Sequence, residues 1–265
     1  MALKKIEKVS KMTQQSSQIK ITQLCEQIRP AIRFLAEKLL ADLDDNLISL
    51  CVVGSSVTDD FHPRFSDINT VVVTRSRSHE LLKTIAGYGS AMGKKKLRAP
   101  LLMTPEYIQQ SPDVFGVEFL DFQLNHVVVF GPDPFTELTM GKEDVRLQCE
   151  RQLKAALIKL RQGYIRCLGK PKPVGQLLIE CVGELAVLLR ALLWLIDCER
   201  PKCAQPTLVL AAEKFSFEAD KIIPLFKLKQ QHQQPPSEQA ERLFENLYQA
   251  IDHLARKVDQ LGTAP

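Results

Sequence analysis

The chain has 265 residues, of which 45% are hydrophobic and 25% are charged, and its formal net charge at pH 7 is +4. This length can bury a substantial core in one large domain or two smaller ones. The mild positive charge suits a phosphate-bearing ligand. It falls short of the basic surface of a dedicated nucleic-acid binder, which argues against nucleic acid as the main partner.

The cysteines and the apolar stretches exclude further classes. The seven cysteines are odd in number, lack metal-type spacing and follow no signal-peptide core, which disfavours both a disulfide scaffold and a zinc protein. The most apolar stretch, Leu185 to Ile196, is interrupted by Arg190 and is too short to span a bilayer. We therefore expect a cytoplasmic protein without a membrane segment.

The first 141 residues predict a polar tail followed by an α/β domain. Residues 1–20 are rich in Lys, Gln and Ser and indicate a flexible tail. Apolar residues at helical spacing from Ile21 to Leu43 predict a helix, with Pro30 as a break or kink. The apolar run from Leu47 to Val53 predicts a buried strand. The elements expected next are a polar turn over 55–65, a strand over 67–74, a helix over 79–88, a strand over 98–103, a helix with Thr104 as its N-cap and Pro105 at its first position, and strands over 117–123 and 126–130.

After Gly141 the pattern becomes helical. The last helix carries apolar residues at heptad-like spacing from Leu243 to Leu261, so it should pack against neighbours. The fold class expected is α+β, with a mixed-sheet domain over 21–141 and an all-helical bundle over 142–265. The helices expected in the bundle cover 145–167, 174–198, 207–215, 219–228 and 237–261.

Polar residues between the first two strands form the candidate site. Gly54 follows the first strand, and a glycine lets phosphate oxygens approach the backbone, where amides and the hydroxyls of Ser55 and Ser56 can donate to them. Asp67 and Asn69 are two residues apart on the next strand, so both side chains should project from one face. Such a pair can hold one or two hard cations. Each motif alone is typical of a turn or a solvated strand edge, but their order and spacing favour a site.

The segment 52–73 resembles the signature of the polymerase-β-like nucleotidyltransferase superfamily: an apolar strand, Gly-Ser, a polar spacer, then Asp-x-Asp/Glu on an apolar strand. Within it the chain is most similar to small bacterial nucleotidyltransferases of the aminoglycoside type, which add a C-terminal helical bundle. The segments 111–121 and 126–135 contribute to this resemblance, which covers residues 47–165.

The resemblance implies a transferase that moves a nucleoside monophosphate group from a nucleoside triphosphate, ATP first, to a hydroxyl-bearing acceptor held between the two domains. It implies Mg²⁺ or Mn²⁺ as cofactor. The nucleotide would be held by Gly54, Ser55, Ser56 and Ser66. Asp67 would be the main metal ligand, and the identity of the acceptor stays open.

A third carboxylate on a later strand would complete the implied site or act as general base, and Glu118 and Asp121 are the candidates. Their separation by three residues prevents both from sharing one strand face unless a bulge intervenes. Glu118 is slightly favoured, and it would join Asp67 and Asn69 as a metal ligand.

Asn69 departs from the family pattern, because it stands where the second carboxylate belongs. Its amide oxygen can coordinate a cation but is neutral, so a two-metal centre loses a full negative charge. Asp59 and Asp60 either compensate or are solvated turn residues. The alternative function is a catalytically impaired nucleotide-binding or protein-interaction module of the same fold. A homodimer or a partner protein on the helical domain stays open.

A basic run, Lys94-Lys95-Lys96 with Arg98, lies beside the third predicted strand. It either reaches a triphosphate or another anionic partner, or it forms a solvated edge that blocks strand pairing.

Overall fold

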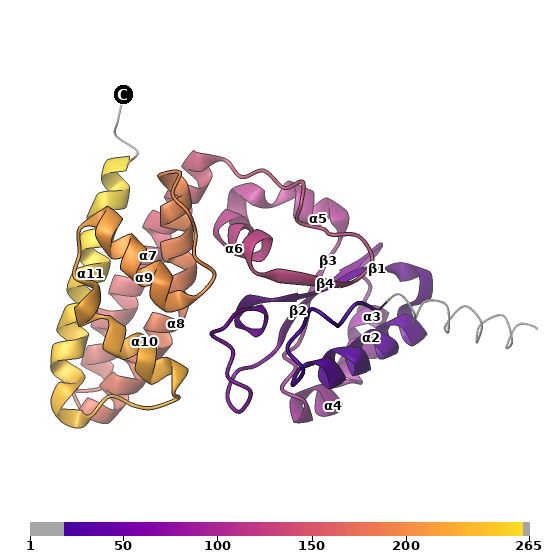
Figure 1. The fold of residues 1–265 in the computed structure, drawn as a ribbon, viewed down its shortest axis with the longest axis horizontal. Coiled ribbons are helices and arrows are strands. Elements are labelled where there is room, and N and C mark those ends of the chain that lie inside the picture. Colours follow the sequence, from indigo (N-terminus) through magenta and orange to yellow (C-terminus); the bar gives the residue numbers. More distant parts are fainter. Residues whose placement is uncertain (1–18, 262–265) are drawn as a thin grey trace, which may run out of the picture. The chain divides into compact units, whose positions relative to one another are not determined.

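The computed structural model describes residues 19–261, which form two compact units. The first unit runs to Ser111 and resumes over Asn125–Leu138, and the second comprises Pro112–Leu124 and the chain from Thr139 onward. Figure 1 colours these segments along the sequence. Residues 1–18 of the expected tail lie outside the described residues.

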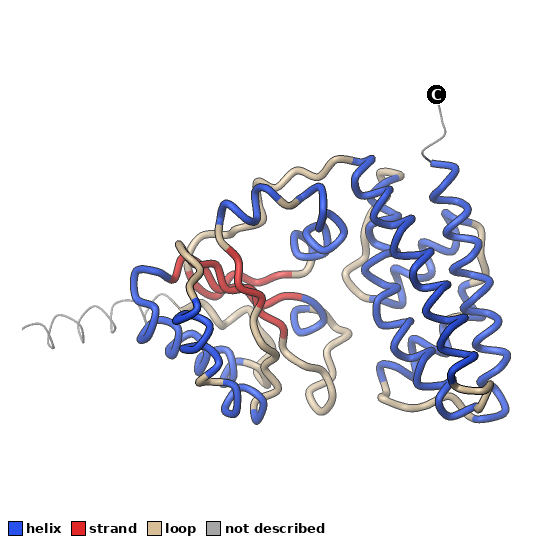
Figure 2. Tube along the Cα trace, turned by 180° about the vertical axis from the view of Figure 1, so that it is seen from behind, coloured by secondary structure: helices blue, strands red, loops and turns tan. Residues whose placement is uncertain are grey.

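The first unit is built on a four-stranded mixed sheet in the order β3-β2-β1-β4, drawn in red in Figure 2. β1 pairs antiparallel with both β2 and β4, whereas β2 and β3 run parallel. The strand expected over 47–53 is confirmed without change, and the next strand begins two residues later than expected. The strands are β1 (Leu47–Val53), β2 (Asn69–Thr74), β3 (Leu101–Met103) and β4 (His126–Phe130).

Helices and short 3-10 turns complete the first unit. Figure 1 shows α2, α3 and α4 grouped on the same side of the sheet, and their apolar side chains share one core with β1 and β2. Thr104 caps α5 as expected, accepting a hydrogen bond from the Tyr107 amide at 3.2 Å. The elements are α2 (Arg29–Leu43), η1 (Asp44–Asn46), η2 (Gly54–Val57), α3 (His79–Ala86), α4 (Gly89–Lys94) and α5 (Pro105–Gln110).

The helix expected from Ile21 begins only at Arg29, and Pro30 lies in its first turn. Residues 21–28 instead form turns that end at the helix start. Because the first turn of a helix has no intrahelical partner for its amides, the missing N–H of proline costs nothing there. Pro30 therefore marks the beginning of α2 and does not kink it.

The strand expected over 117–123 is wrong, because this segment is part of helix α6 (Pro112–Leu124), which has a kink at Phe115. Val117 and Leu120 enter the core of the second unit. The side chain of Gln148 holds the helix by accepting from the Val117 amide and donating to the Asp113 carbonyl. An apolar run of this length fits a strand or a buried helix equally well, and packing decides between them.

The second unit is all-helical and has its own core. In the final helix the expected apolar stripe is buried from Leu243 to Val258, and Leu261 is exposed. The division of the chain differs from the expected boundary at 141, since residues 112–124 belong with these helices. The fold is therefore α+β, as expected. The later helices are α7 (Lys142–Arg166), α8 (Pro171–Leu195), α9 (Ala204–Phe215), η3 (Ala219–Lys221), α10 (Ile223–Gln230), η4 (Ser237–Gln239) and α11 (Ala240–Leu261).

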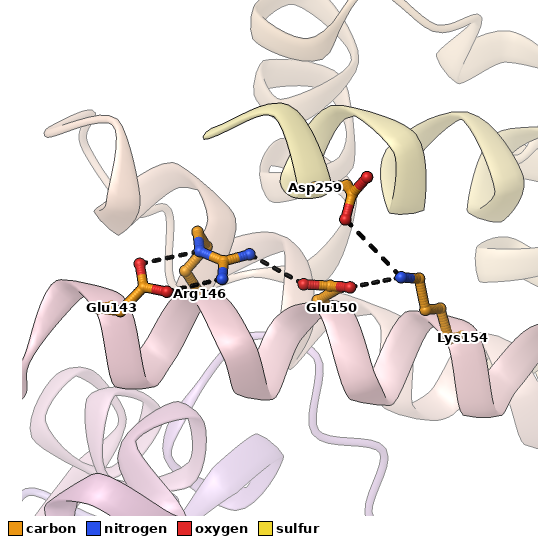
Figure 3. Close-up of polar contacts among 5 residues, drawn as sticks. All are labelled: Glu143, Arg146, Glu150, Lys154 and Asp259. Atoms are coloured by element: carbon orange, nitrogen blue, oxygen red, sulfur yellow. Dashed lines mark hydrogen bonds and ion pairs between the residues drawn. The ribbon is translucent and has the colours of Figure 1, made fainter. Parts of the chain in front are cut away.

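A run of ion pairs follows one side of α7 and reaches α11 (Figure 3). Arg146 joins Glu143 at 2.7 Å and Glu150 at 2.9 Å. Lys154 pairs with Glu150 and lies 3.8 Å from Asp259 of α11. The contact between Lys154 and Asp259 is the one of this run that joins α7 to α11, and because both side chains are exposed it contributes little to stability.

Among residues 19–261, no helix combines the length and the apolar character that crossing a membrane requires.

Candidate functional site

The turn after β1 has the backbone geometry that the phosphate hypothesis needs. Gly54 has a φ of +77°, which favours glycine because a Cβ is strained there. A Cβ added at Gly54 would lie 3.8 Å from the Asn69 side chain, so the turn and Asn69 are neighbours. The Gly54 amide donates to the Asn125 carbonyl at 3.0 Å, so it is not free to bind phosphate. The later amides of η2 are the candidate donors.

The three predicted serines have different roles. The Ser56 hydroxyl is buried and donates to the Val53 carbonyl at 3.1 Å, and the Ser66 hydroxyl accepts from the His62 amide at 3.0 Å. Both close the local turns. For the Ser55 hydroxyl, no hydrogen bond to another described residue is found, so it is available to a ligand both as donor and as acceptor.

Asp67 and Asn69 lie at the start of β2. The strand begins at Asn69, and Asp67 precedes it. Ile68 between them is buried in the core that α2, α3 and α4 share with the sheet. Because side chains alternate along an extended chain, Asp67 and Asn69 point to the other face. Asn69 pairs in register with Val53, which places it beside the Gly54 turn.

Asp67 forms an ion pair with Arg98. The Arg98 Nε lies 2.8 Å from the Asp67 Oδ2, and the two side chains are 67% and 44% exposed. The backbone supports this approach, since the Arg98 amide donates to the Ile68 carbonyl at 3.0 Å. The charge that was expected to bind a metal is therefore partly neutralised by a neighbouring guanidinium. The 31 residues that separate Asp67 from Arg98 leave no local signal from which this pair could have been predicted.

Lys96 holds the loop before Asp67 against the segment that carries Arg98. It is a non-glycine residue with a φ of +58°, a conformation that needs support from its surroundings. Its Nζ donates to the Pro63 carbonyl at 2.9 Å and also to the Arg64 carbonyl. Lys96 of the expected basic run therefore has a structural role, because it links its own segment to the loop at residues 63–64.

Glu118 and Asp121 lie on α6 in the second unit, not on a strand. Asp121 is 5% exposed, and Arg190 donates to it at 2.6 Å. Gln152 donates to Glu118 Oε1 at 3.3 Å, whereas the buried Oε2 has no hydrogen-bond partner among the described residues. Burial, together with the charge of Glu118, raises the pKa of the Cys149 thiol to about 12. The carboxylate of Asp121 is thus engaged by Arg190, whereas Glu118 keeps one carboxylate oxygen without a donor among the described residues.

The later strands of the first unit supply no third carboxylate. β3 reads Leu-Leu-Met and β4 reads His-Val-Val-Val-Phe. Among the described residues, no group of three or more His, Cys, Asp and Glu side chains is arranged to hold a metal. The first unit offers the paired carboxylate of Asp67 and the neutral amide of Asn69. A two-cation centre needs more negative charge than this, so these residues do not fit it.

An open surface cavity of about 640 Å³ lies on the second unit, lined among others by Trp194, Asp197, Arg200 and Lys202. Trp194 is half-buried, packs against the helical core and lines this cavity. Burial, helped by the neighbouring charge of Arg190 and opposed by that of Asp121, lowers the pKa of Arg200 below its usual range. The volume is typical of a small-molecule site.

Neither sequence comparison identifies a relative. No protein-family model matches the chain, and no curated protein matches it.

The structure, in contrast, is similar to solved ones. The crystal structure of spectinomycin adenyltransferase AAD(9) from Enterococcus faecialis with ATP and spectinomycin matches with a TM-score of 0.53 at 12% identity, covering 87% of this chain and 98% of that one. A likeness at this identity shows the fold. The fold that the resemblance to aminoglycoside nucleotidyltransferases implied is therefore confirmed.

Proposed function

We propose that the first unit binds a nucleoside triphosphate, with ATP as the first candidate, at the turn after β1. The positive φ of Gly54 and the available hydroxyl of Ser55 support this proposal. The fold is shared with an adenyltransferase whose crystal structure contains ATP, which supports nucleotidyl transfer as the general class of chemistry. The cytoplasmic location remains a prediction.

Within this class, the geometry favours binding without efficient transfer. The single observation that carries this conclusion is the position of Asn69, beside the Gly54 turn. Transfer depends on charge compensation at the phosphates and on a base for the attacking hydroxyl. The side-chain amide of Asn69 is neutral, and the carboxylate of Asp67 is paired with Arg98. We therefore favour the nucleotide-binding module over the active enzyme.

Transfer to a small hydroxyl-bearing acceptor is the second candidate function. The cavity beside Trp194 and Arg200 favours it, because its size and charged lining suit a small polar molecule. The similar adenyltransferase was solved with spectinomycin, a small molecule. Glu118, whose Oε2 has no hydrogen-bond partner among the described residues, stays the candidate general base for such a transfer.

The first prediction concerns binding. Calorimetric titration with ATP should show saturable binding, and Gly54→Val should weaken it about tenfold or more, about 1.4 kcal/mol, because the β-branched side chain strains the turn. Gly93→Ala is the matched control, since a Cβ at Gly93 meets nothing within 4 Å. Circular dichroism of both variants checks their folding. If the intact chain does not bind ATP, both candidate functions fail.

Pyrophosphate release separates the two candidates. The module predicts ATP binding without release, both in the natural chain and in Asn69→Asp. Release in the presence of aminoglycosides or spectinomycin, with an increase in Asn69→Asp, would instead establish transfer.

A further inference from the structure

The inference rests on the proposed nucleotide site and concerns how the phosphate charge is compensated there. In nucleotidyl transfer, divalent cations normally bridge the phosphates to protein carboxylates. Here the guanidinium of Arg98 contacts Asp67, the one carboxylate among Asp67 and Asn69. Arg98 contacts Asp67 through Nε at 2.8 Å, at the point where the chain enters β2 beside the Gly54 turn.

The guanidinium of Arg98 has capacity for a second anion. It carries five N–H donors in a planar fork, and the contact with Asp67 is made through Nε. The side chain is 67% exposed, so the other donors can reach a ligand. Arginine is suited to phosphate because its fork matches two phosphate oxygens at once.

The position of Arg98 is set by backbone structure on both sides. The Ile68 amide donates to the Lys96 carbonyl at 2.8 Å, and the Arg98 amide donates back to the Ile68 carbonyl at 3.0 Å. These two bonds form the isolated parallel bridge between Ile68 and Leu97. The backbone of Arg98 is therefore hydrogen-bonded to Ile68, the residue that lies between Asp67 and Asn69.

We propose that this site takes the phosphates of a nucleotide without a divalent cation, and that Arg98 supplies the positive charge. Asp67 then orients Arg98 and is not a metal ligand. Lys96 assists by tying the preceding loop to the same segment. The alternative is that Asp67 and Arg98 form only an exposed ion pair on a solvated edge, which would contribute little to stability or to ligand binding.

The first arm of the test compares ATP titrations in EDTA and in excess Mg²⁺. The proposal predicts dissociation constants that agree within about twofold in the two buffers. Arg98→Gln should weaken binding in EDTA about tenfold or more, since charge-assisted bonds are lost, and Arg98→Lys should fall in between. Arg33→Gln is the matched control, because Arg33 is exposed on α2 in the same unit and should bind as the natural chain does.

The second arm uses Asp67→Asn, which distinguishes Asp67 as a cation ligand from Asp67 as the residue that orients Arg98. If Asp67 holds a cation, this variant loses nucleotide binding. If Asp67 orients Arg98, the asparagine oxygen can still accept from Arg98 while the charge that repels the phosphates is gone, so binding in EDTA is kept or tightened up to severalfold. Thermal melting of Arg98→Gln and Asp67→Asn confirms that both remain folded.

The outcomes separate this inference from the proposed function. Binding that requires Mg²⁺, or that is lost in Asp67→Asn, overturns the inference and leaves the nucleotide site standing. Binding in EDTA that is unchanged in Arg98→Gln overturns the role of Arg98. Failure to bind ATP in either buffer removes the proposed function itself.

Discussion

Asp121 and Arg190 show how burial changes the role of a charged residue. Their side chains are 6% and 8% exposed, and Arg190 Nε lies 2.6 Å from Asp121 Oδ1. Arg190 also donates to the Lys202 carbonyl at 3.3 Å. A buried charge that loses its partner keeps its desolvation cost without compensation. Asp121, expected as a catalytic candidate, is therefore a structural residue in the second unit.

Replacing Asp121 tests this role. Asp121→Ala should lower the free energy of unfolding by about 3–5 kcal/mol, because Arg190 is left buried without a counterion. Urea denaturation followed by the fluorescence of Trp194, the one tryptophan of the chain, measures the change. Asp220→Ala, at an exposed position in the same unit, is the control and should stay within about 0.5 kcal/mol of the natural chain. Unchanged stability in Asp121→Ala would return Asp121 to the catalytic candidates.

At the scale of elements, the end of β4 depends on one glycine. Gly131 has a φ of +76°, and a Cβ there would lie 1.9 Å from the Ile48 carbonyl oxygen of β1. This atom belongs to the backbone of a central strand and cannot move aside as a flexible side chain would. The sheet register between β1 and β4 therefore requires glycine at this position.

Gly131→Ala is expected to destabilise the chain by more than the about 1–3 kcal/mol that a strained backbone conformation costs, since the clash adds to the strain. Gly93→Ala is again the control: it lies within α4 and should be neutral or stabilise by up to about 1 kcal/mol. Thermal melts of the two variants give the comparison. Equal melting temperatures would show that β4 can separate from β1 without cost.

At the scale of the whole molecule, the second unit is discontinuous in sequence. α6 precedes β4 in the chain, yet it contributes Val117 and Leu120 to the helical core and Asp121 to the ion pair with Arg190. A cut at the expected boundary of 141 would remove all three. The helical unit is therefore complete only with residues 112–124.

Two fragments test this composition. A fragment of residues 142–265 should melt without a cooperative transition, because it exposes apolar surface and leaves Arg190 uncompensated. A fragment of residues 112–265 retains α6 and should melt cooperatively. Circular dichroism at increasing temperature distinguishes them. Cooperative melting of the shorter fragment near the midpoint of the longer one would show that α6 is dispensable.

The sequence by itself determined the features that depend on local periodicity and local chemistry. The apolar run of β1, the Thr104 cap of α5 and the buried stripe of α11 were all predictable, because each follows from residues within a few turns or one strand length. The glycine at the turn after β1 and the alternation around Ile68 were predictable for the same reason.

Only the tertiary structure decided the features that depend on contacts distant in sequence. The run from Val117 to Gln123 fits a strand or a helix, and packing against α7 and α8 made it a helix. The pairing of Asp67 with Arg98 and of Asp121 with Arg190 spans 31 and 69 residues. Charges so far apart in the chain meet only when the fold brings them together, and those meetings determine which carboxylates remain available for chemistry.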